Sequence, residues 1–137
     1  MMTVQTIPLD QRLNLLGILA HAKPVVQVFL FLLIVLLVAS IAVWIGQLAQ
    51  GKRAAIVDDV LSAVLISAPL FGLTAATYGL LDMSIGIANV RPAPDLAILA
   101  PGFAEASLCV TLGLLAASLA AAFRGHLRLS ATRAAAA

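Results

Sequence analysis

Three long apolar segments dominate the chain, and polar residues gather between them. Residues 24–50 and 60–81 contain no charged residue, and residues 96–123 contain one, Glu105. An α-helix of about 20 residues covers the roughly 30 Å hydrocarbon core of a bilayer. The pattern therefore predicts an all-α membrane protein with three transmembrane helices.

A shorter pattern precedes the first apolar segment. Leu9, Leu13 and Leu16 recur at helical spacing, which predicts a short amphipathic helix at the membrane interface, with a frayed terminus as the alternative. The expected elements are an interfacial helix at 9–21, transmembrane helices at 24–50, 58–87 and 96–124, and a flexible tail at 125–137, all within one membrane domain, 1–137.

Composition supports a membrane protein and excludes several kinds of chemistry. The chain is 63% hydrophobic and 10% charged, whereas soluble domains carry about 25% charged residues. The formal net charge is only +2 and the basic residues lie at helix ends, so we expect no nucleic-acid partner. Cys109 is the only cysteine, and neither a metal-ligand spacing nor a nucleophile–base set is visible. We therefore expect no metal site, no cofactor and no enzymatic activity.

Small residues recur at helical spacing in the second and third apolar segments. Gly72, Ala76 and Gly79 lie in the second segment, and Gly113 and Ala117 lie in the third. Small side chains let transmembrane helices approach closely. We therefore expect these residues to form helix-packing faces.

Glu105 is the main functional candidate. A carboxylate at the middle of a membrane costs about 2.5–3.5 kcal/mol on insertion scales, so it must be protonated, paired, or directed toward other helices or water. Hydroxyl groups of Thr74, Thr77 and Thr111, with Asp82 at the end of the second segment, could complete a proton path with it. A structural hydrogen bond from a neutral Glu105, or an outward reach to the interface, remains the alternative.

Several short motifs resemble one known family. Residues 68–73 (APLFGL), 78–80 (YGL) and 85–87 (IGI) resemble the second-helix pattern of the MotA/TolQ/ExbB proton-channel family. Residues 100–106 (APGFAEA) are similar to its third-helix signature, and Ser40 before Trp44 resembles the first helix of TolQ and ExbB.

This resemblance implies a function and an assembly. Family members form a pentamer around single-span partners of the ExbD/TolR type in the bacterial inner membrane, and they use proton flow to drive a partner protein. Glu105 falls on the glutamate that lines the family's pore. The chain is thus expected to be a proton-channel or stator-like subunit of an energy-transducing complex.

Three departures from the family pattern keep an alternative open. The family's two pore threonines fall on Ala76 and Val110, with Thr77 and Thr111 one residue later, and such a shift turns a helical side chain by about 100°. Only residues 52–59 connect the first two helices, where TolQ and ExbB carry a cytoplasmic domain. The alternative is a non-conducting structural or assembly subunit. A small transporter lacks support because no inverted repeat is visible.

The distribution of basic residues predicts the orientation. The connection after the first helix and the C-terminal segment hold most of them, which favours an N-terminus outside and a cytoplasmic C-terminus. Asp82 and Glu105 then both lie toward the outer half of the membrane, on neighbouring helices.

Overall fold

Three long helices make up the described part of the chain. The computed structural model describes residues 23–50, 55–91 and 95–136. The helices are α2 (Pro24–Gln50), α3 (Ala55–Ala88) and α4 (Leu96–Ala136). All three are long and apolar enough to cross a membrane, which confirms the expected all-α class with three spanning helices. The helix expected at 9–21 lies outside the described residues.

The helix boundaries differ from expectation mainly at the end of α4. The bounds of α2 coincide with the expected 24–50, and α3 is longer than the expected 58–87 by a few residues. In contrast, α4 does not end at Arg124 but continues to Ala136, through the segment expected to be flexible. Residues 125–136 contain no proline and are rich in alanine, leucine and arginine, which are strong helix formers.

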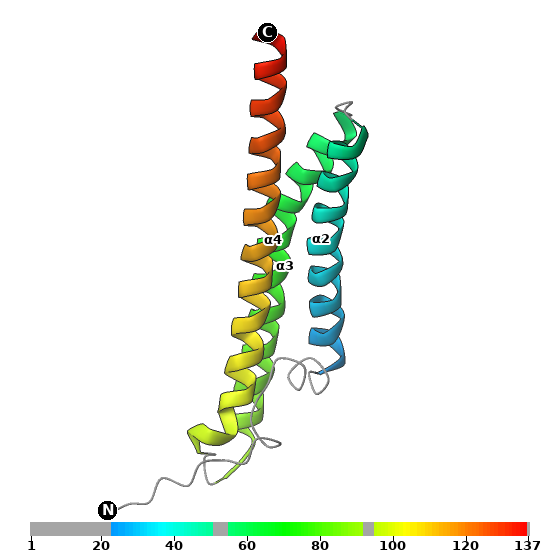
Figure 1. The fold of residues 1–137 in the computed structure, drawn as a ribbon. Coiled ribbons are helices and arrows are strands. Elements are labelled where there is room, and N and C mark those ends of the chain that lie inside the picture. The colour runs from blue at the N-terminus through cyan, green and yellow to red at the C-terminus, as the bar shows by residue number, and fades with distance from the viewer. Residues whose placement is uncertain (1–22, 51–54, 92–94, 137) are drawn as a thin grey trace, which may run out of the picture.

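The helices form an up-down-up arrangement in which α3 and α4 are antiparallel neighbours (Figure 1). Helix α2 packs along both of them. The C-terminal turns of α4 extend beyond the ends of α2 and α3 (Figure 1). The three helices lie together in the middle of the bundle, α3 and α4 continue as a pair beyond the start of α2, and α4 alone extends at the opposite end (Figure 1).

The interior of the bundle is apolar and contains two clusters of buried side chains. One cluster joins Leu33 of α2 and Leu61 of α3 to Ala120 of α4. The other joins Leu30 of α2 to Cys109 of α4, with alanines of α3 and α4 between them. The side chains of Leu30, Leu33, Leu61 and Cys109 are all fully buried. Because the three helices share both clusters, α2 is held against both α3 and α4.

Helices α3 and α4 meet backbone to backbone where Gly72 faces Gly113. A Cβ atom added to Gly72 would lie 2.6 Å from the carbonyl oxygen of Cys109, and one added to Gly113 would lie 2.6 Å from that of Ala68. Ala76 and Ala117, one turn further along their helices, are also buried. In lipid there is no hydrophobic driving force between helices, because the acyl chains are as apolar as the side chains. Close van der Waals packing is therefore a main source of helix association.

Gly79 differs from the other small residues. A Cβ atom added to it would meet no atom of the described chain within 4 Å. The close contact between α3 and α4 therefore does not extend to this glycine.

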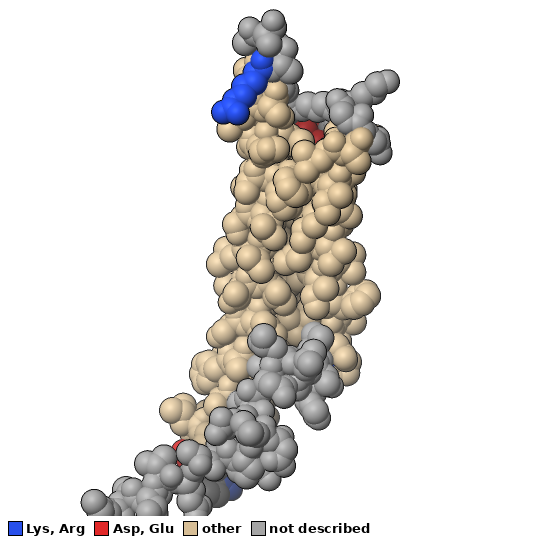
Figure 2. Space-filling model, in the orientation of Figure 1, with Lys and Arg blue, Asp and Glu red and all other residues tan. Residues whose placement is uncertain are grey.

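The exterior of the bundle is apolar over most of its length. Figure 2 shows a broad band without charged side chains on one face, with charged groups toward the ends. Large side chains on the outer side of α2 are strongly exposed, including Val28 at 68% and Phe31 at 69%. Exposed apolar surface of this extent suits hydrocarbon and would be an aggregation risk in water. The described fold is therefore compatible with immersion in a bilayer.

We expect Gly113→Ala to destabilise the α3–α4 pair, because the added methyl group would collide with the backbone of Ala68. Overpacking of this kind costs about 1–3 kcal/mol. The measurement is denaturant or heat unfolding of the detergent-solubilised protein followed by circular dichroism. Gly79→Ala is the matched control, since its methyl group meets open space and alanine favours a helix interior by about 0.5–1 kcal/mol. Equal stability of the two variants would contradict the packing described above.

Candidate functional site

Glu105 lies on the side of α4 that faces α2. Phe123 follows Glu105 by 18 residues, which is five full turns, so the two side chains share one face of α4. Phe123 stacks on Trp44 of α2, with ring centroids 4.6 Å apart. Helix α2 therefore runs along the stripe of α4 that begins at Glu105.

The carboxyl group of Glu105 is partly enclosed, and its hydrogen bonding is incomplete. Its Oε1 atom is buried and has no hydrogen-bond partner among the described residues. Ala106, its neighbour in the chain, belongs to the buried cluster that contains Val26 in the first turn of α2. The backbone amide and the ammonium group of Lys23, at the start of α2, act on this carboxyl group. Glu105 thus lies where α4 meets the beginning of α2.

Asp82 lies at the same end of the bundle and forms an ion pair with Lys23. The Gly72–Gly113 contact fixes the relative height of the two antiparallel helices. Asp82 lies ten residues from Gly72, about 15 Å along α3, and Glu105 lies eight residues from Gly113, about 12 Å along α4 in the same direction. The Cα atoms of Asp82 and Glu105 therefore differ in height by only about 3 Å.

A second contact supports this placement. A Cβ atom on Gly102 of α4 would lie 2.8 Å from the sulfur of Met83, the residue after Asp82. The three helices thus bring Lys23, Asp82 and Glu105 together at one end, and we call these three residues the charged triad. The sequence predicted two of its members. Lys23 was missed because a lysine just before an apolar helix is usually a solvated boundary residue.

The threonines expected to work with Glu105 face elsewhere. Thr74, Thr77 and Thr111 are exposed, and each hydroxyl donates a hydrogen bond to a carbonyl oxygen of its own helix. The donor–acceptor distances are 2.8 Å from Thr74 to Leu70, 2.9 Å from Thr77 to Leu73 and 2.8 Å from Thr111 to Ser107. Within one chain, then, these hydroxyls and Glu105 do not form a continuous path.

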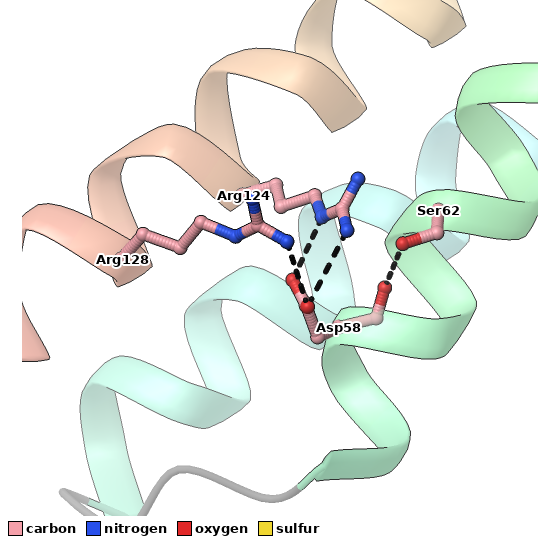
Figure 3. Close-up of polar contacts among 4 residues, drawn as sticks. All are labelled: Asp58, Ser62, Arg124 and Arg128. Atoms are coloured by element: carbon pink, nitrogen blue, oxygen red, sulfur yellow. Dashed lines mark hydrogen bonds and ion pairs between the residues drawn. The ribbon is translucent and has the colours of Figure 1, made fainter.

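The opposite end of the bundle holds another group of charges. Asp58, in the first turn of α3, accepts a hydrogen bond from Arg124 Nε at 2.8 Å and one from Arg128 at 3.2 Å (Figure 3). Ser62 donates to the backbone carbonyl of Asp58 (Figure 3). This group ties the start of α3 to α4 at the place where the apolar band ends. We interpret it as a structural link between the two helices, because one carboxylate of α3 holds two arginines of α4.

The described residues contain no group of three or more histidine, cysteine, aspartate or glutamate side chains placed to hold a metal ion. Cys109 is buried and unpaired. The chemistry available at the charged triad is therefore that of carboxyl and ammonium groups, namely proton binding and ion pairing.

We expect Thr77→Val and Thr111→Val to change the stability of the isolated protein by less than about 0.5 kcal/mol. Each hydroxyl is exposed and bonds only to its own helix, and surface substitutions of this kind are usually nearly neutral. Denaturant unfolding of the purified variants provides the measurement. A loss of more than 1 kcal/mol would show that these hydroxyls make contacts that the single chain does not reveal.

Comparison with known proteins gives one partial similarity. No family model matches this chain. A curated relative, the biopolymer transport protein ExbB of Pseudomonas putida, is 39% identical over 69 residues. This match covers 50% of the present chain and 21% of the relative, so the chain spans about a fifth of the length of the protein that it resembles. Half of the chain is therefore similar in sequence to part of a biopolymer transport protein.

Proposed function

We propose that this chain is a proton-conducting, ExbB-like subunit of an energy-transducing complex in a bacterial inner membrane, and that Glu105 exchanges the proton. The observation that carries the proposal is a single carboxyl group in the apolar segment 96–123, with a buried oxygen that has no hydrogen-bond partner among the described residues. Ionisable groups inside membrane helices are costly, and they commonly mark ion or proton pathways.

The partial similarity to ExbB supports the same proposal. On this basis the working unit is a homo-oligomer, a pentamer by resemblance, that encloses a single-span partner of the ExbD/TolR type. The relative is named for biopolymer transport. The proton flow would then drive transport work through that partner.

The geometry indicates where a path would run. Phe123 lies about 27 Å along α4 from Glu105, which is close to the thickness of the hydrocarbon core. With Phe123 packed beside Trp44 near the far end of α2, Glu105 would lie near one membrane boundary. A proton could reach it from that side. The remaining path would run between subunits, where the outward hydroxyls of Thr74, Thr77 and Thr111 would line contacts with other copies or with the partner.

A structural, non-conducting subunit is the second candidate, and one observation favours it. All three threonine hydroxyls are already satisfied by their own helices, and the two positions of the family's pore threonines hold Ala76 and Val110. Such a subunit would use the same α3–α4 bundle to scaffold a complex.

Proton flux in proteoliposomes distinguishes the two candidates. The protein is purified with whichever single-span membrane protein co-purifies with it, and uptake is followed with a pH-sensitive dye under a potassium diffusion potential. We expect wild-type flux above that of protein-free liposomes and a fall of at least tenfold in Glu105→Gln, which cannot release a proton. Glu105→Asp should retain part of the flux. Ser118→Ala is the control, because this exposed hydroxyl of α4 also bonds only to its own helix.

Two results would support the structural candidate instead. One is equal flux in the wild type and Glu105→Gln. The other is wild-type flux no greater than that of empty liposomes although the complex has assembled.

The proposed orientation, with the N-terminus outside and the C-terminus in the cytoplasm, has its own test. We expect Ser130→Cys, in a Cys109→Ser background, to react with a membrane-impermeant maleimide only after intact spheroplasts are permeabilised. Labelling of intact spheroplasts would reverse the orientation.

A further inference from the structure

We propose that Lys23 is a positioning residue for Glu105: anchored by Asp82, it supplies the positive charge that stabilises the carboxylate form of Glu105. This inference deepens the proposed function and rests on it, since it concerns the same carboxyl group. It assigns a role to a residue that the sequence motifs do not include.

The first argument is the position of Lys23 at the junction of the three helices. It directly precedes α2, and its ammonium group forms an ion pair with Asp82 of α3. Its backbone amide and its charge both act on Glu105 of α4. One cation therefore serves two carboxyl groups that come from different helices.

The second argument is the asymmetry between the two carboxyl groups. Asp82 has the ammonium group of Lys23 as a direct partner, whereas Oε1 of Glu105 is buried and has no hydrogen-bond partner among the described residues. A carboxylate with an unsatisfied buried oxygen is unstable unless a positive charge lies nearby. The start of α2 provides such a charge twice, from Lys23 and from the positive end of the helix dipole.

The third argument is that the arrangement leaves Lys23 free to adjust. Its side chain is 62% exposed, and lysine carries its ammonium group on a flexible four-carbon stem. The ammonium group can remain at Asp82 while Glu105 holds a proton, and it can move toward Glu105 when that proton leaves. The described groups that act on or beside Glu105 are Lys23 at the start of α2 and the Cys109 thiol one turn along α4. Asp82, at nearly the same height on α3, is the ion-pair partner of Lys23.

Labelling by a carbodiimide tests this role without any measurement of flux. Dicyclohexylcarbodiimide modifies protonated carboxyl groups in apolar surroundings, so the pH dependence of Glu105 modification, measured by mass spectrometry on protein in nanodiscs, reports its protonation. We expect Lys23→Met to raise the pH of half-maximal labelling by about one unit or more, as removal of a nearby opposite charge does. Lys23→Arg should restore the wild-type value. Arg133→Met, which removes an exposed cation at the other end of α4, is the matched control and should change nothing.

A second variant, Asp82→Asn, should shift the pH of half-maximal labelling in the opposite direction. Asp82→Asn frees Lys23 to pair with Glu105 and also removes a neighbouring negative charge, so the pH of half-maximal labelling should fall. A merely structural role for Lys23 would leave the labelling profile of folded Lys23→Met unchanged. Asp82→Asn also keeps the test decisive if Lys23→Met fails to fold, which circular dichroism would show.

Several results would overturn the inference. They are an unchanged labelling profile in Lys23→Met or in Asp82→Asn, an equal change in Arg133→Met, or absence of Glu105 labelling at every pH in both the wild type and Lys23→Met. The proposed conduction can fail separately, because a flux measurement with no signal leaves these labelling profiles unaffected.

Discussion

The backbone contact between Gly72 and Gly113 is the constraint on which the rest of the bundle depends. Because no side chain separates the two helices there, the register of α3 against α4 is fixed by atoms that cannot change rotamer. That register places Asp82 and Glu105 at nearly the same height, and it places Asp58 beside Arg124 and Arg128 at the other end. Both groups of charges are thus consequences of one close approach between glycines.

Helix α2 contributes something different. Its outer side is exposed and apolar, and its inner side fills the space along α3 and α4 with Leu30 and Leu33. Its two ends make more specific contacts. Trp44 stacks on Phe123 at one end, while Lys23 meets the carboxyl groups of the neighbouring helices at the other. The helix that looks least functional in the sequence therefore completes the surroundings of Glu105.

The fold could be predicted from the sequence to a large extent, because uncharged segments of spanning length leave few alternatives to helices in a bilayer. The end of α4 could not be predicted in this way. The change from apolar to basic residues at Arg124 indicates a membrane boundary, but it does not end a helix. Glu105 could be predicted as a site residue, because it is the one charged residue in the apolar segment 96–123. The direction of its side chain was not evident, because the sequence does not show which face of α4 lies against α2. For the same reason the sequence did not reveal Lys23. Its proposed role depends on the packing of α2 against α3 and α4, which brings it to Asp82 and Glu105.

The length of α4 has a mechanical consequence. Measured from Gly113, the helix extends eight residues to Glu105 and 23 residues to Ala136, or about 12 Å and 35 Å. If α4 tilts as a rigid rod about the glycine contact, its C-terminal tip sweeps nearly three times the distance travelled at the carboxyl group. A displacement of one ångström at residue 105 thus becomes roughly three at the tip. Arg124 and Arg128 lie on the longer arm of this rod, so their ion pairs with Asp58 would resist any such tilt.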